Sequence, residues 1–313
     1  MRTRRLLVVR PDRLGDCVVS AGVLKPLVER YAAKTEITWC VKREYLALWE
    51  KVSAIQPMAL EELGTFFERA NGRGNTAVFL NPERALEARA KQAGYRVFSW
   101  GKTLPDTRKH CKKPEAAYCA DLLEAAGFPI GIPARPWLAP RARAPQNAPQ
   151  KPYVLIHAGA FGQKPSLCAA TVLALSEALA ARGLAIVWAG LDTRREEGAG
   201  LMDAAGKRNI LALGAALPME ELVGWLAGAR GVIGRDSGLS HLAAALGTPT
   251  VALVGPLAKK LAARRWGLTG AKATTIELPM APLWFESDRR YQRRYFDAVK
   301  TMAFIETLEA LWR

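Results

Sequence analysis

Apolar, strand-like runs alternate with helix-like segments along this 313-residue chain, in two series. The first series has strand patterns at 6–10, 36–42 and 75–81, and helix patterns at 17–31 and 114–127. The second has strand patterns at 153–159, 184–190, 231–234 and 250–255, and helix patterns at 169–183, at 217–229 and after Asp236. Strands that alternate with helices build parallel sheets through right-handed crossovers. We therefore predict an α/β fold of two Rossmann-like domains.

A proline-rich stretch separates the two series. Seven prolines lie from Pro129 to Pro152, and neither a helix nor a central strand tolerates that density. We therefore place an N-terminal domain at 1–135, a linker at 136–152 and a C-terminal domain at 153–290. The last segment, 291–313, has a helical pattern.

The composition is strongly basic, with a net charge of +16 and a pI near 9.9. Basic side chains gather at 109–113, 259–265 and 289–294. Such a balance favours an acidic partner, either nucleic acid or an anionic membrane surface, unless it is simply a solvated basic surface. No helix-turn-helix, RRM or zinc pattern occurs, so we expect no nucleic-acid partner.

The cysteines and the hydropathy of the chain narrow the possible class of protein further. The five cysteines are scattered without a C-x-x-C pair, and there are three histidines, so we predict no metal site. No apolar run approaches the roughly 18 residues of a membrane span. We therefore expect a cytoplasmic protein.

The most specific string is DSGLSHLAAALGTP, residues 236–249. It follows the apolar run GVIG and precedes TVALVG, so it forms the turn and helix of a strand–turn–helix unit. The N-terminus of a helix carries N–H donors and partial positive charge, and it readily binds a phosphate. Capping of the helix by Asp236 and Ser237 is the alternative explanation.

A second loop follows the first strand pattern, in LLVVRPDRLGDCVVSAGVL at 6–24. Arg10 ends this strand pattern, and Asp12, Gly15 and Asp16 lie just after it. Ligands of open α/β folds bind at the carboxyl ends of parallel strands. The chain has no G-x-G-x-x-G after its first strand and no Walker A string, which argues against an ordinary dehydrogenase.

These two strings resemble glycosyltransferase family 9, the ADP-heptose:lipopolysaccharide heptosyltransferases. A weaker match is HAGAFGQKPS at 157–166, where the family usually has Pro-Gly-Ala and then a Lys. The resemblance implies the GT-B fold, whose two Rossmann-like domains have parallel sheets facing a central cleft. In such proteins the C-terminal helix often packs back on the N-terminal domain. No Asp-x-Asp pair occurs, so we expect a metal-independent enzyme without a cofactor.

Inverting glycosyl transfer needs a base for the acceptor hydroxyl and a group that stabilises charge on the departing phosphate. Asp16 is the predicted base, and the resemblance implies the same role. Its alternative role is to cap a helix that starts near Cys17, in which case Asp12 is the next candidate. We expect Arg10 and Arg13 either to orient Asp16 or to bind an acidic acceptor.

The donor is expected in the C-terminal domain. Lys164 is the predicted cation for the phosphate, and the family has a phosphate-contacting Lys there. His241 bonds either a phosphate or a backbone carbonyl, and a loose match places Asp192 near the nucleoside. The predicted donor-binding residues are Lys164, Asp192, Asp236, Ser237, Gly238, Leu239 and His241.

The expected reaction moves heptose from ADP-heptose to an acidic lipopolysaccharide inner-core acceptor. The basic surface would make peripheral contact with the inner face of the cytoplasmic membrane. After Gly255-Pro256 the family commonly continues Thr-Asp-Pro, whereas this chain continues LAKKLAARRWG, which leaves the sugar open. The alternatives are a relative with another nucleotide sugar or a protein acceptor, and a nucleotide-sugar-binding protein without catalysis.

Overall fold

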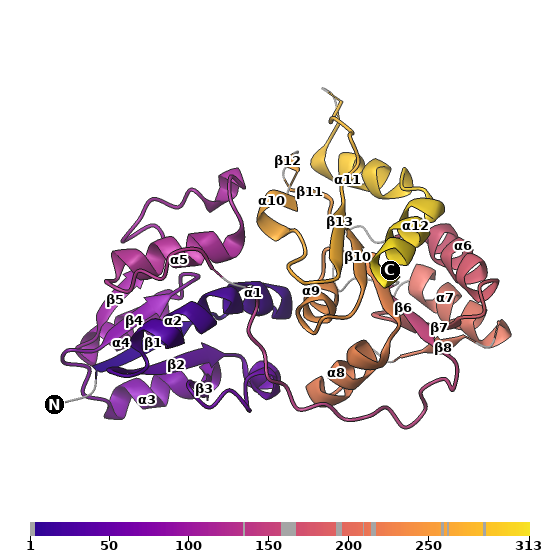
Figure 1. Ribbon diagram of the computed structural model, residues 1–313. Coiled ribbons are helices and arrows are strands. Elements are labelled where there is room, and N and C mark those ends of the chain that lie inside the picture. Colours follow the sequence, from indigo (N-terminus) through magenta and orange to yellow (C-terminus); the bar gives the residue numbers. More distant parts are fainter. Residues whose placement is uncertain are drawn as a thin grey trace. The chain divides into compact units, whose positions relative to one another are not determined.

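The computed structural model describes residues 4–133, 135–157, 167–191, 196–208, 210–213, 217–257, 260–261, 263–283 and 286–313. The chain divides into two compact units, 1–141 and 142–313 (Figure 1). The division falls within the proline-rich stretch, where the described residues between 129 and 152 form neither helix nor strand.

The first unit is a parallel sheet of five strands in the order β3-β2-β1-β4-β5. The strands are β1 (Arg4–Val9), β2 (Thr35–Val41), β3 (Gln56–Ala59), β4 (Thr76–Phe79) and β5 (Arg96–Ser99). The α-helices are α1 (Leu14–Ser20), α2 (Leu24–Tyr31), α3 (Leu63–Arg69), α4 (Arg84–Gln92) and α5 (Glu115–Ala125).

Helices cover both faces of this sheet, with α3 on the opposite side from α1 and α2 (Figure 1). Successive side chains of a strand alternate between faces. In β1, Leu7 and Val9 pack with Leu63 of α3, while Leu6 and Val8 are fully buried on the other face. A strand buried on both faces reads as a continuous apolar run, as the first strand pattern does.

The second unit is a parallel sheet of six strands in the order β13-β10-β9-β6-β7-β8. Its strands are β6 (Tyr153–His157), β7 (Ala185–Ala189), β8 (Leu211–Ala212), β9 (Gly231–Arg235), β10 (Thr250–Leu253) and β13 (Ala273–Ile276), and β11 (Pro256–Leu257) pairs antiparallel with β12 (Lys260–Leu261). Its helices are α6 (Ala169–Ala180), α7 (Glu196–Lys207), α8 (Met219–Gly228), α9 (Gly238–Ala245), α10 (Ala263–Trp266), α11 (Asp288–Asp297) and α12 (Thr301–Trp312).

Helices α11 and α12 complete the core of the second unit. Tyr291 and Phe296 of α11 and Phe304 of α12 belong to one buried cluster with Ile233 of β9, and α12 contacts β9 and β10. The expectation that segment 291–313 also packs back on the N-terminal domain stays a prediction. Its apolar side chains are used by the sheet of its own unit.

Each sheet has one point at which the strand order reverses. In the first sheet β1 and β4 are neighbours there, and in the second β6 and β9 are neighbours. Ligands of open α/β sheets bind outside the carboxyl ends of the strands at such a switch point. The loops that leave these four strands are therefore the places in which to look for a functional site.

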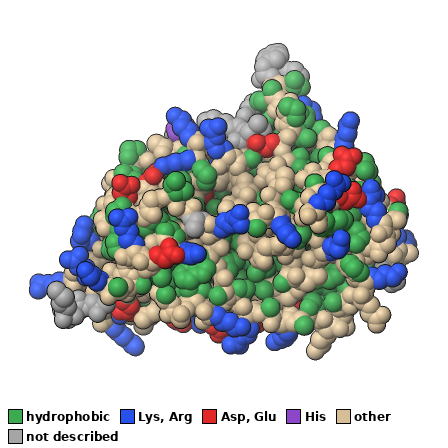
Figure 2. Space-filling view, viewed as in Figure 1, with side chains coloured by type: hydrophobic (Ala, Val, Ile, Leu, Met, Phe, Trp, Pro, Cys, Tyr) green, Lys and Arg blue, Asp and Glu red, His purple; other side chains and the backbone are tan. Residues whose placement is uncertain are grey.

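Basic side chains are spread over the surface. Figure 2 shows Lys and Arg side chains scattered over the visible face among hydrophobic and uncharged ones. None of the described helices combines the length and the apolar character of a membrane span. Surface charge by itself therefore marks no single binding face in this view.

Candidate functional site

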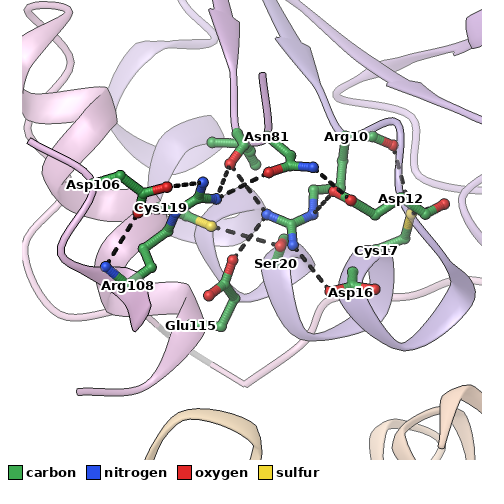
Figure 3. A network of polar contacts seen from close by, with 11 residues as sticks. Arg10, Asp12, Asp16, Cys17, Ser20, Asn81, Asp106, Arg108, Glu115 and Cys119 are labelled. Carbon is green, nitrogen blue, oxygen red and sulfur yellow. Dashed lines mark hydrogen bonds and ion pairs between the residues drawn. The ribbon is translucent and has the colours of Figure 1, made fainter. Parts of the chain in front are cut away.

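Arg10 is the centre of a polar network at the switch point of the first sheet (Figure 3). It directly follows β1, and its side chain is 2% exposed. Nη1 donates to Glu115 Oε1 at 2.9 Å and to the Leu80 carbonyl at 3.3 Å, and Nη2 donates to Asp16 Oδ1 at 3.2 Å. Nε lies 2.8 Å from Asp12 Oδ2. One guanidinium thus holds three carboxylates.

Asp16 lies in the first turn of α1. The helix begins at Leu14, and its N-cap residue, Arg13, makes no side-chain capping hydrogen bond. The alternative in which Asp16 caps a helix starting near Cys17 is therefore wrong, because the helix starts three residues earlier. The N-terminal turn stabilises the Asp16 carboxylate as an anion. Arg13 is exposed.

A second layer of contacts supports Asp12. Asn81, which follows β4, donates from Nδ2 to Asp12 Oδ1 at 2.8 Å. Arg108 Nη1 donates to Asn81 Oδ1 at 3.3 Å and to the Leu80 carbonyl at 3.1 Å. Asp106 in turn accepts from Nε and Nη2 of Arg108, each at 2.8 Å. The loops after β1 and β4 are thereby tied together.

Burial is the strongest influence on the pKa of both Arg10 and Asp12. It opposes the charge of Arg10, but the acidic groups packed around the guanidinium outweigh it and raise the Arg10 pKa. Burial raises the pKa of Asp12, and the Arg10 charge only partly offsets this. Of the two roles expected for Arg10, the structure has the one in which it orients Asp16, because its guanidinium is buried among carboxylates.

The sequence did not single out Asn81, Arg108 or Glu115. Asn81 ends a strand pattern, so the rule that ligands bind at the carboxyl ends of parallel strands applies to Asn81 as it does to Asp12. Glu115 stands 105 residues from Arg10, in a helix pattern that shows only an amphipathic face. No local signal connects it to the loop.

The DSG string forms the start of α9 at the switch point of the second sheet. Ser237 is the N-cap, and its Oγ accepts from the Ser240 N–H at 3.2 Å. Asp236 Oδ1 lies 3.0 Å from His241 Nε2, so the recorded partner of His241 is this carboxylate rather than a backbone carbonyl. Ser237 therefore does cap the helix. The amides of Gly238 and Leu239 lie in the first turn, where N–H groups have no intrahelical acceptor.

Close packing brings α9 against the end of the sheet. A Cβ at Gly234 would lie 2.9 Å from His157 Cβ and 3.1 Å from Ser240 Oγ, so glycine is needed there. His157 ends β6 and Arg235 ends β9, and both side chains are buried. The sequence noted His157 only as a departure from the family pattern and did not single out Arg235.

Two predicted donor residues, Lys164 and Asp192, lie outside the described residues. The other five, residues 236–239 and 241, lie together in the first turn of α9 and just before it. Asp16, Arg10 and Arg13 lie together after β1. The described candidates therefore form two groups, one at each switch point.

Replacement of Arg10 by Met should lower the free energy of unfolding by about 3–5 kcal/mol, because the buried Glu115 carboxylate and the partly exposed Asp12 and Asp16 lose their shared counter-charge. Urea unfolding at pH 7 measures this. Arg13→Met is the matched control, since Arg13 is exposed three residues away, and it should change stability by no more than about 0.5 kcal/mol. Equal effects of the two variants would contradict the role given to Arg10.

His157 should make stability depend on pH in the acid range. Burial, with a smaller contribution from the Arg235 charge, lowers the pKa of His157 to about 4, whereas an unfolded histidine titrates near 6.5. The unfolded chain therefore binds a proton first. This contribution to stability is complete above pH 6.5, and up to about 3 kcal/mol is lost as the pH falls towards 4.

Urea unfolding of His157→Gln between pH 4 and 7 checks this. The variant should lack this part of the acid loss, while His110→Gln, at an exposed position, should keep the full pH dependence. If His157→Gln and the unsubstituted protein lose stability in parallel, His157 titrates normally.

Several proteins of known structure have a similar architecture. A search of curated proteins gives no match. Among solved structures, the glycosyltransferase family 9 protein from Veillonella parvula has a TM-score of 0.76 at 15% identity, with 100% of this chain and 98% of that chain covered. E. coli ADP-heptose lps heptosyltransferase II has a TM-score of 0.71 at 19% identity, covering 99% and 98%. E. coli heptosyltransferase WaaC with ADP has a TM-score of 0.69 at 16% identity, covering 98% and 99%.

These structures share the fold of the chain, two parallel α/β sheets of the GT-B type, and the predicted fold class is confirmed. One family model, Glycosyltransferase family 9 (heptosyltransferase), matches residues 88–281. That match spans more than half of the sequence, from α4 through the donor string to the loop after β13. The chain therefore belongs to glycosyltransferase family 9, the heptosyltransferase family.

Proposed function

We propose that this glycosyltransferase transfers heptose from ADP-heptose to an acidic lipopolysaccharide inner-core acceptor, with inversion and without a metal or cofactor. The observation that carries the proposal is the Asp16 carboxylate, held by Arg10 beyond the carboxyl end of β1. Similar folds that carry the names ADP-heptose heptosyltransferase II and WaaC with ADP support the choice of donor.

Asp16 suits the role of general base better than Asp12. Asp12 has both carboxylate oxygens engaged, Oδ2 with Arg10 and Oδ1 with Asn81. Asp16 uses Oδ1 for Arg10, and its side chain is 26% exposed. A base must direct an oxygen at the hydroxyl proton that it removes.

The remaining roles divide between the two groups of residues. In the proposal, the first turn of α9 and Lys164 bind the diphosphate of the donor, and Asp192 lies near the nucleoside. Exposed Arg13, three residues before Asp16, contacts the acidic acceptor. The basic surface makes peripheral contact with the inner face of the cytoplasmic membrane, where the lipid-linked acceptor lies.

Three alternative functions would use the same residues. A different nucleotide sugar or a protein acceptor would use the same base and the same α9 turn. A donor panel assayed with lipid-linked and protein acceptors separates these from the proposed reaction. Binding of ADP-heptose with no turnover on any acceptor would instead indicate a nucleotide-sugar-binding protein.

Asp16→Asn should reduce transfer from ADP-heptose by a factor of about 10² to 10⁴, because the amide keeps the shape of the side chain but accepts no proton. ADP affinity, from calorimetry, and melting temperature should stay near those of the unsubstituted enzyme. Asp12→Asn is the matched comparison. It should lower the melting temperature through its buried contacts and retain more transfer than Asp16→Asn. The reverse ranking of the two transfer rates would make Asp12 the base.

Transfer should survive EDTA at millimolar concentration. The three carboxylates beyond β1 already share the Arg10 guanidinium, which occupies the position that a cation would need between them. Transfer rates measured with EDTA and with added Mg²⁺ should agree within a factor of about two. Complete loss under chelation that Mg²⁺ or Mn²⁺ restores would contradict protein-based stabilisation of the leaving group.

A further inference from the structure

Arg235 is a buried cation with an unusual environment. It is the last residue of β9, 5% exposed, and its guanidinium lies over the ring of Phe296 at 5.2 Å. Its Nε and Nη1 are buried, and neither has a hydrogen-bond partner within the described parts of the chain. Asp236, the adjacent acid, directs Oδ1 to His241.

The other two buried arginines, Arg10 and Arg108, differ from Arg235 in their hydrogen-bond partners. Arg10 and Arg108 are buried to a similar degree, and each has its guanidinium bound to carboxylates. A buried charge without such partners costs several kcal/mol. Burial lowers the pKa of Arg235, and the charge of Asp236 only partly offsets this. Within the described part of the chain, the charge of Arg235 is therefore incompletely compensated.

The position of Arg235 indicates which group would complete it. β9 and β6 are the neighbours at the switch point of the second sheet, and Arg235 and His157 are their last residues. Three residues further along the chain, α9 begins at Gly238 with amides that attract an anion. A guanidinium presents a planar fork of donors that matches phosphate oxygens.

We propose that Arg235 is a phosphate-binding residue of the donor site, and that its guanidinium binds an oxygen of the nucleoside diphosphate beyond the carboxyl end of β9. This inference rests on the proposed function for the identity of the nucleotide. It adds to Lys164 and the α9 turn a cation within the sheet itself. On departure of the diphosphate, the same guanidinium stabilises the developing charge.

The test is the affinity of the full-length protein for inorganic pyrophosphate, measured by calorimetry for three variants. Arg235→Met should weaken binding roughly tenfold to hundredfold, since it removes a charge-assisted hydrogen bond. Arg235→Lys keeps the charge without the planar fork and should recover part of the affinity. Arg290→Met, which removes an exposed arginine of the same unit, should bind as the unsubstituted protein does.

Thermal unfolding distinguishes a ligand role from a structural one. Arg235→Met should melt at the same temperature or higher, because it removes an incompletely compensated buried charge. Arg108→Met, which breaks a carboxylate-paired arginine, should melt lower. Unchanged pyrophosphate affinity in Arg235→Met overturns the inference. So does a lower melting temperature in both Arg235 variants with no recovery of affinity in Arg235→Lys.

ADP separates this inference from the proposed function. If the unsubstituted protein binds pyrophosphate and Arg235→Met does not, but ADP binds no better than pyrophosphate, the phosphate role stands and the adenine nucleotide is wrong. If the unsubstituted protein binds ADP but Arg235→Met binds it equally well, the donor stands and the role of Arg235 is wrong. If the unsubstituted protein binds neither at millimolar concentration, both are wrong.

Discussion

The first unit depends on one buried guanidinium. Three acidic side chains from two segments far apart in sequence meet beside β1 only because Arg10 lies between them. Without a shared cation, carboxylates gathered there would repel one another. With it, Asp16 is held in the first turn of α1 by Arg10 Nη2. The geometry of the candidate base is therefore a consequence of an ion-pair network rather than of loop packing alone.

Buried arginines have different partners in the two units. In the first, Arg10 and Arg108 are bound to carboxylates and bring the loops after β1 and β4 together. In the second, Arg235 lies over an aromatic ring at the end of β9. Arginines that are fully paired with carboxylates suit the presentation of a base, whereas incomplete compensation suits the capture of an anion. The two switch points are alike in topology and different in electrostatics.

Much of the fold followed from pattern alone. Long apolar runs such as 6–10 and 153–159 correspond to β1 and β6, which are buried on both faces and must be apolar throughout. The four-residue strands β3 and β5 have no such run and were not predicted. The start of α1 was placed three residues too late, because no capping side chain marks it. The periodicity of 291–313 shows that the segment has an apolar face, but not which sheet covers that face, and in the structure it packs against β9 and β10.

The candidate site, like the fold, could be predicted only in part from the sequence. Asp16 lies in the first turn of the helix after β1, and Ser237 lies two residues after β9, so their positions at a sheet edge could be deduced from the local sequence. The partners of Asp16 could not, since Arg10 had two plausible roles and Glu115 none. Arg235 was missed because a basic residue at the end of a strand looks like ordinary surface charge until its burial is known.

The long separation in sequence between Arg10 and Glu115 has a consequence for the order in which the enzyme folds. Glu115 opens α5, the last helix of the first unit, while Arg10 follows its first strand. During synthesis, the loop that carries Arg10 and Asp16 leaves the ribosome about a hundred residues before Glu115, the carboxylate that binds Arg10 Nη1. The loop has its full set of partners only after α5 docks. The buried setting of Arg10 is thus completed late in folding, and an N-terminal unit without its last helix would present Asp16 beside an arginine whose Nη1 lacks its carboxylate partner.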